Sequence, residues 1–186
     1  RMKTSLPKQF IELNGLPVLM HTMRTFHQWN ATANLVLVLP EMEIERWREL
    51  VLKHQFDVNH QIVKGGKERF HSVKNGIKNV DSDYIFVHDG VRPFVSNQTL
   101  NNCISALQTY TAVVPVIAAK ESVRQVIAGE NKALDRNQLY VVQTPQCFHR
   151  ETLINAYQCN FDAKFTDDAS VVEHCGEKIH CVEGYD

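Results

Sequence analysis

The chain has 186 residues, which is enough for one domain with a well-buried core. Its 20 basic and 21 acidic residues give a formal net charge of −1, which argues against binding nucleic acids or membranes through bulk charge. The hydrophobic content of 44% is typical of a globular protein, and the longest apolar run, 112–119, is too short to cross a bilayer.

The first two-thirds of the chain alternates between β-branched runs and segments with helical periodicity. The runs predict buried strands at 35–39, 60–63, 84–87 and 112–117. Apolar stripes predict helices at 16–29 and 41–54, a third helix marked by Val73, Ile77 and Val80, and a fourth whose N-cap is Ser96. This alternation predicts an α/β fold, with a mostly parallel sheet covered by helices on both faces.

The pattern changes after residue 118. Two short strands are predicted at 122–127 and 139–143, and the polar, turn-rich link between them has no helical pattern. The sequence therefore predicts a protruding antiparallel arm within residues 118–143. Helical patterns resume at 149–159 and again from Thr166, and a last strand is predicted at 178–182.

The stretch "FVHDGVRPF" places polar residues directly after a buried strand. His88, Asp89 and Arg92 follow the strand at 84–87, and ligands of open α/β sheets bind beyond the carboxyl ends of the strands. A carboxylate there can hold a metal ion or a ribose hydroxyl, and a guanidinium can hold phosphate. A surface turn with a structural Asp–Arg pair explains the same residues equally well.

Two further segments are compatible with a phosphate or nucleotide ligand. In "KGGKERFHSVKNG", Gly65 and Gly66 allow close backbone approach just before a helix N-terminus, although an ordinary strand-to-helix turn also favours glycine. In "RMKTSLPKQF", Arg1, Lys3 and Lys8 form a basic segment that suits a triphosphate. Taken alone, this second segment is better explained as a solvated loop.

The C-terminal third adds two threonines and a cysteine-containing segment. "TPQCF" supplies Thr144 and "TDDAS" supplies Thr166, which alternatively caps the helix whose first turn contains Asp167 and Asp168. The segment "HCGEKIHC" at 174–181 contains zinc-ligand residue types, but its spacing matches no familiar site, so a structural role is favoured.

Cysteine usage indicates a reducing compartment. The number of cysteines is odd and no C-x-x-C occurs, so a disulfide framework is not expected. We therefore expect a cytoplasmic protein. The cysteines are Cys103, Cys147, Cys159, Cys175 and Cys181.

In chain order, these motifs resemble one family. "RM…LPKQF", "GLPVLMHTMRTF", "GGKERFHSVKNG", "VHDGVRPF", "LDRNQLYVVQTPQCF" and "TDDASVVEHCG" are similar to segments of 2-C-methyl-D-erythritol 4-phosphate cytidylyltransferases, enzymes of the non-mevalonate isoprenoid pathway. The resemblance implies a Rossmann-like nucleotidyltransferase domain over 1–186 and a homodimer formed through the arm at 118–143. It also implies that the family's first strand, most of its Gly-rich loop and a C-terminal basic segment lie beyond the ends of this sequence.

The resemblance also implies a reaction and its participants. A sugar-phosphate oxygen attacks the α-phosphorus of CTP, pyrophosphate leaves, and Mg²⁺ bridges the triphosphate oxygens. Ribitol-5-phosphate cytidylyltransferases share similar motifs and are the nearest alternative, although the stretch from "ESVRQV" to "VVQTPQ" is more similar to the methylerythritol enzymes. A non-catalytic nucleotide-binding protein of the same fold is the alternative from another class.

Individual positions match the family's functional residues. Lys67 stands where relatives often carry an acidic residue near the cytosine, which is a departure from the pattern. The resemblance implies roles for Arg1 and Lys8 at the charged transition state, Gly66 and Ser72 at cytosine, Asp89 at ribose or metal, and Ser122, Arg136, Thr144 and Thr166 at the polyol phosphate.

Overall fold

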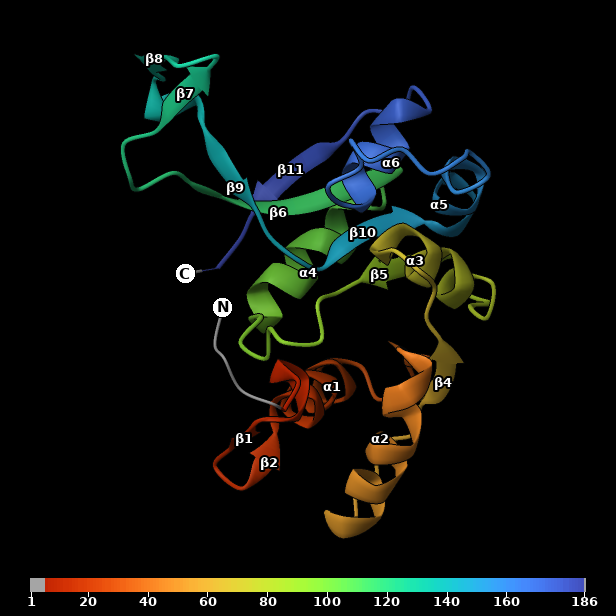
Figure 1. Ribbon diagram of the computed structural model, residues 1–186. Helices are drawn as coiled ribbons and strands as arrows, with labels where there is room; N and C mark the ends of the chain where they lie inside the picture. Colours follow the sequence, from red (N-terminus) through yellow and green to blue (C-terminus); the bar gives the residue numbers. More distant parts are fainter. Residues whose placement is uncertain (1–5, 186) are drawn as a thin grey trace.

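A computed structural model describes residues 6–185, and Figure 1 shows the arrangement of their helices and strands. The helices are α1 (Val18–Trp29), α2 (Glu41–Lys53), α3 (Arg69–Ile77), α4 (Asn97–Ala106), α5 (Arg150–Ala156) and α6 (Asp168–His174), with short 3-10 turns η1 (Lys8–Phe10) and η2 (Arg136–Gln138). The strands are β1 (Glu12–Leu13), β2 (Leu16–Pro17), β3 (Val36–Leu39), β4 (Gln61–Lys64), β5 (Tyr84–Val87), β6 (Ala112–Ala118), β7 (Arg124–Ile127), β8 (Glu130–Ala133), β9 (Tyr140–Val142), β10 (Gln146–His149) and β11 (His180–Glu183).

The main sheet is mixed rather than mostly parallel. Its strand order is β11-β6-β10-β5, in which β11 pairs parallel with β6 while β10 runs antiparallel to both β6 and β5. Sequence periodicity missed β10, which follows directly on Pro145 and lies between the predicted strand at 139–143 and the predicted helix at 149–159. The predicted α/β class is confirmed, and the antiparallel strand is the correction to it.

A second, separate pair of strands carries the N-terminal part of the fold. β3 and β4 pair in parallel, as the sequence pattern predicts. Helix α3 contacts both of these strands and also contributes Phe70 and Ile77 to the core beneath the main sheet. It therefore lies between the two sheets, as the yellow helix in Figure 1 shows.

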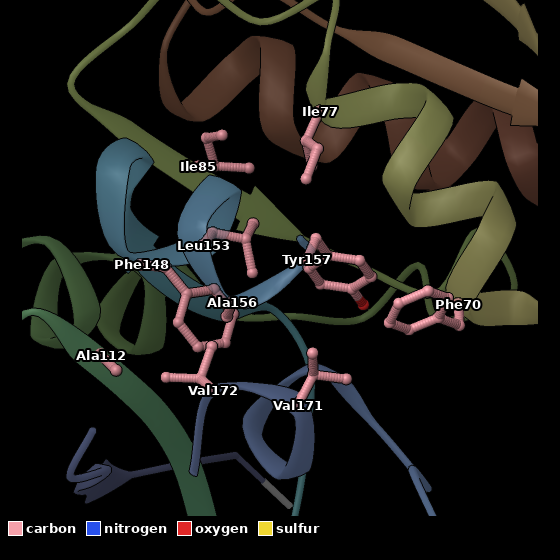
Figure 2. Packing of buried hydrophobic residues seen from close by; sticks show 10 residues of the cluster. All are labelled: Phe70, Ile77, Ile85, Ala112, Phe148, Leu153, Ala156, Tyr157, Val171 and Val172. Carbon is pink, nitrogen blue, oxygen red and sulfur yellow. The ribbon is translucent and has the colours of Figure 1, made fainter. Parts of the chain in front are cut away.

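The larger core brings together α3, α5, α6 and the main sheet. Figure 2 shows Phe70 from α3, Tyr157 from the end of α5, and Phe148 from β10 converging on one cluster. The rings of Phe70 and Tyr157 stack with centroids 4.7 Å apart. A second cluster forms around the fully buried Trp47 of α2. The apolar stripes therefore pack as predicted, and α3 is fixed by the larger cluster.

The predicted arm exists, but its strands pair differently. β7 and β8 form an antiparallel hairpin that closes through Ala128 and Gly129, both at positive φ, which is the geometry of a tight hairpin turn. The polar link thus contains a strand, β8, that the sequence did not indicate. The other predicted arm strand, β9, pairs with β6 of the main sheet, and the hairpin protrudes beyond it (Figure 1).

Helix α4 has the side-chain cap that the sequence predicts, whereas α1 begins later than predicted. Ser96 caps α4 as predicted, since its hydroxyl oxygen accepts a hydrogen bond from the backbone N–H of Thr99. α1 begins at Val18 rather than at residue 16, because Leu16 and Pro17 form β2. None of the helices within residues 6–185 combines the length and apolarity needed to cross a membrane.

Candidate active site

The two glycines after β4 form a tight turn against the start of α3. The backbone N–H of Gly66 donates to Ser72 Oγ at 3.0 Å, and that hydroxyl donates to the carbonyl of Glu68 at 3.2 Å. A Cβ on Gly66 would lie 2.3 Å from Cβ of His71, so a side chain cannot be accommodated there. The structure therefore brings Gly66 and Ser72 together, with backbone exposed beyond a strand end.

The strand end after β5 is organised by an ion pair. Arg92 Nε lies 3.0 Å from Asp89 Oδ2, and the Arg92 N–H donates to the Asp89 carbonyl at 3.1 Å. Both side chains are partly exposed, so this pair adds little stability and leaves the carboxylate within reach of a ligand. The hydroxyl oxygen of Thr144 accepts a hydrogen bond from the Asp89 N–H at 3.4 Å, which places Thr144 beside Asp89.

Helix α1 and His88 hold this loop in place. The Thr22 and Thr25 hydroxyls donate to the carbonyls of Gly90 and Pro93, each at 3.0 Å. His88 Nε2 donates to the Arg92 carbonyl at 2.9 Å. Burial lowers the pKa of His88, so the ring stays neutral near pH 7 and serves as a hydrogen-bond anchor for the loop.

A buried carboxylate joins α3 to α6. Asp168, at the start of α6, is fully buried and receives two hydrogen bonds from the Arg69 guanidinium, at 2.9 and 2.6 Å. The Tyr157 hydroxyl donates a third at 2.6 Å. Burial acts to lower the pKa of Arg69, but the hydrogen bonds and charge of Asp168 outweigh it and raise that pKa. Burial, and then the Asp168 charge, raise the pKa of Tyr157, so its hydroxyl stays protonated as a donor.

The N-terminus of α6 is also fixed to β10. Gln146 donates from Nε2 to Asp167 Oδ2 at 2.7 Å and accepts the Ala169 N–H at 2.8 Å. Asp167 caps the helix in a capping box with Ser170. The cap is therefore Asp167, and the alternative that Thr166 caps α6 is wrong. Thr166 lies exposed one residue before the cap.

The remaining predicted site residues lie on other elements. Lys8 is exposed in η1, which packs against α1. Ser122 is exposed in the arm, ahead of β7, and Arg136, in η2, donates to the Lys120 carbonyl at 3.1 Å. Arg1 lies outside the described residues, and its role stays a prediction.

Several residues of the site were missed by sequence analysis. The pairing of Arg69 with Asp168 spans 99 residues of chain, and no local pattern reveals such a contact. For Asp168, the sequence pattern predicts only an acidic residue in the first turn of a helix and does not predict its burial. Within residues 6–185, no three His, Cys, Asp or Glu side chains gather closely enough to hold a metal ion, and this includes the cysteine-containing segment at 174–181.

The glycine turn after β4 and Asp89 after β5 lie at the carboxyl ends of their strands, which is where α/β proteins of this class bind ligands. Among solved structures, 4-diphosphocytidyl-2C-methyl-D-erythritol synthase from Anaerococcus prevotii superposes with a TM-score of 0.84 and 27% identity, covering 95% of this chain and 84% of that one. The 2-C-methyl-D-erythritol 4-phosphate cytidylyltransferase from Francisella tularensis superposes with a TM-score of 0.82 and 28% identity, covering 97% of this chain and 85% of that one.

Comparison of amino-acid sequences points to the same enzymes as the solved structures. A protein named 2-C-methyl-D-erythritol 4-phosphate cytidylyltransferase from Bacteroides fragilis is 44% identical over 185 residues, which cover 99% of this chain and 84% of that protein. The sequence profile of the family with the same name matches residues 1–186. The chain belongs to the 2-C-methyl-D-erythritol 4-phosphate cytidylyltransferase family.

The Arg69–Asp168 pair predicts an asymmetric loss of stability. Arg69→Met leaves a fully buried carboxylate with only the Tyr157 hydroxyl, so unfolding free energy should fall by about 3–5 kcal/mol. Asp168→Asn leaves a guanidinium that is 42% exposed and can turn to water, so the loss should be smaller. Urea unfolding measures both, with Arg48→Met on the exposed face of α2 as the control. Equal losses in the two variants would contradict this account of the pair.

Proposed function

We propose that this protein transfers a cytidylyl group from CTP to 2-C-methyl-D-erythritol 4-phosphate, releasing pyrophosphate. The product is 4-diphosphocytidyl-2-C-methyl-D-erythritol, an intermediate of non-mevalonate isoprenoid precursor synthesis. The observation that carries the proposal is the family match over residues 1–186. Relatives at 41–45% identity are named for the methylerythritol substrate, so ribitol 5-phosphate is the less favoured acceptor.

The reaction forms one P–O bond and breaks another. An oxygen of the polyol phosphate attacks the α-phosphorus of CTP, and the bond to the β-phosphate oxygen breaks as pyrophosphate leaves. Such a displacement depends on alignment and charge neutralisation rather than on a protein nucleophile. In this proposal Lys8 and Arg1 supply positive charge to the triphosphate. The exposed position of Lys8 in η1 supports this, because its ammonium group can reach a ligand.

Gly66 and Ser72 form the proposed cytosine-binding segment. The glycine turn lies at a strand end. A side chain at position 66 would collide with His71, so this position presents bare backbone. Backbone amide and carbonyl groups can then read the base edge. Lys67, which departs from the pattern that the family resemblance implies, is exposed beside this turn.

Asp89 is the proposed contact to ribose or to Mg²⁺. Mg²⁺ is usually held by one or two carboxylates together with substrate phosphates, rather than by a cage of protein ligands. A single accessible carboxylate at a strand end fits that chemistry. When bound, Mg²⁺ would neutralise triphosphate charge, while Arg92 orients the Asp89 carboxylate through their 3.0 Å ion pair.

Thr144, Thr166, Arg136 and Ser122 are the proposed contacts to the polyol phosphate. The evidence is strongest for Thr144. Its hydroxyl lies against the backbone of Asp89, and Asp89 is the proposed contact to the nucleotide or its metal ion. Thr166 is exposed at the α6 N-terminus, which is fixed by the Asp167 and Asp168 contacts. Ser122 and Arg136 belong to the arm, so the site that they contact depends on how the arm packs in an assembly.

We further propose a homodimer formed through the arm. Apolar side chains that are 42–68% exposed follow one another along the hairpin and β9, and a two-stranded ribbon needs a partner to be stable. A second copy of the arm in a two-fold assembly would cover them. The side chains are Val126, Ile127, Tyr140, Val141 and Val142.

The substrate assignment predicts a clear preference in a direct assay. With CTP and Mg²⁺, pyrophosphate release should be faster with 2-C-methyl-D-erythritol 4-phosphate than with ribitol 5-phosphate by at least about 10²-fold in kcat/KM, because polar pockets reject mismatched hydroxyl patterns strongly. Mass spectrometry of the product checks that a cytidylyl group was transferred. Preference for ribitol 5-phosphate would reverse the assignment, and absence of turnover with either would favour the non-catalytic alternative.

The role of Asp89 predicts a changed metal requirement. Asp89→Asn keeps the size of the side chain and removes its charge, so half-maximal activity should need several-fold more Mg²⁺ while the fold stays intact. Asp83→Asn, at the opposite end of β5 and exposed, is the matched control. If Mg²⁺ titration curves of the two variants coincide with that of the parent, Asp89 is a structural or ribose-binding residue.

The dimer proposal predicts complementation between two inactive variants. Lys8→Ala should lower kcat by roughly 10²-fold or more, as for loss of one electrostatic stabiliser, and Arg136→Ala should also be nearly inactive. If Arg136 reaches the partner's site while Lys8 serves its own, a heterodimer has one site with both defects and one with neither. Mixing and re-equilibrating subunits should then restore substantial activity. Verified heterodimers that remain inactive would place Arg136 in its own subunit's site.

A further inference from the structure

Two cysteines from different helices meet at one backbone carbonyl. Cys159 follows the end of α5, and Cys175 is the C-cap of α6. The Cys159 N–H donates to the Ala156 carbonyl at 3.4 Å, and the Cys175 thiol donates to the same oxygen at 3.6 Å. The two residues are therefore immediate neighbours, although 15 residues lie between them in the sequence.

The pKa of the Cys159 thiol reflects its burial and its position beside Cys175. Burial, followed by the adjacent Cys175 thiol, raises the pKa of Cys159, and the nearby Lys74 ammonium opposes this weakly. Cys175 is exposed and Cys159 is partly exposed, so reagents in solution can reach the pair. Cys103 and Cys147 differ, because both are fully buried between α4 and β10.

We propose that Cys159 and Cys175 form a dithiol oxidation site that takes low-molecular-weight disulfides. The exposed Cys175 thiolate attacks the reagent's S–S bond, which forms a mixed disulfide and releases one small thiolate. The Cys159 thiolate then attacks the Cys175 sulfur and displaces the second small thiolate. Two cysteine thiols are oxidised, one reagent disulfide is reduced to two thiols, and an intramolecular disulfide remains.

The bridge would close a loop around the start of α6. Residues 160–174 lie between the two sulfurs, and they include Thr166 and the buried Asp168. The Ala156 carbonyl that both residues contact already brings the two ends of this loop together before the bond forms. It would limit the freedom of this segment in the unfolded chain, which is the main way that a disulfide stabilises a protein.

Peptide mapping tests the proposal without any assay of activity. The folded protein is treated with oxidised glutathione, remaining thiols are alkylated, and the protein is digested with trypsin. Cleavage after Arg150, Lys164 and Lys178 places Cys159 in peptide 151–164, Cys175 in 165–178 and Cys181 in the peptide that begins at residue 179. The expected product is 151–164 linked to 165–178, which dithiothreitol separates.

Variants and melting temperature complete the test. Cys159→Ser and Cys175→Ser should each abolish the linked peptide, whereas Cys181→Ser should leave it unchanged. Oxidation should raise the melting temperature on the order of 5 °C, reversibly with dithiothreitol. Three results would each overturn the proposal: glutathione attached separately to the cysteines, a link between 165–178 and the Cys181 peptide, or a 151–164 to 165–178 link that forms only in urea.

Discussion

The charge of Asp168, buried completely within the fold, is the constraint on which the rest of the site depends. A buried carboxylate is strongly unfavourable unless hydrogen bonds and an opposite charge compensate it. Here the compensation comes from Arg69 at the start of α3 and from Tyr157 after α5. The start of α3, which follows the glycine turn, and the start of α6, which follows Thr166, are thereby held at fixed positions relative to each other.

The same elements also form the larger hydrophobic core. Phe70 follows Arg69 in α3, and its ring stacks on the ring of Tyr157, whose hydroxyl binds Asp168. Packing and polar contacts thus act on the same helices, and a change in this core would shift the proposed binding segments. The strand-end loop of Asp89 is held independently, by Thr22 and Thr25 of α1. The proposed nucleotide site therefore has two supports from different parts of the chain.

Local chemistry made much of the fold predictable from sequence. The apolar stripes around Trp47 and Leu100, the Ser96 cap and the β-branched strands all act within a few residues, where periodicity is informative. The strands β8 and β10 were missed, because β8 is polar and exposed and β10 follows directly on a proline. Motif resemblance located Gly66, Ser72, Asp89 and Thr144, and the structure places them in two contacting pairs at strand ends.

What the sequence could not provide is the polar network between distant segments. Arg69 and Asp168 lie in two different motifs, and neither motif alone indicates an ion pair. A double-mutant cycle with Arg69→Met and Asp168→Asn, followed as kcat/KM for CTP and for the polyol phosphate, tests their coupling most directly. The account predicts that the double variant is no less active than the worse single variant, with a coupling energy of about 1–3 kcal/mol. Losses that simply multiply would contradict it.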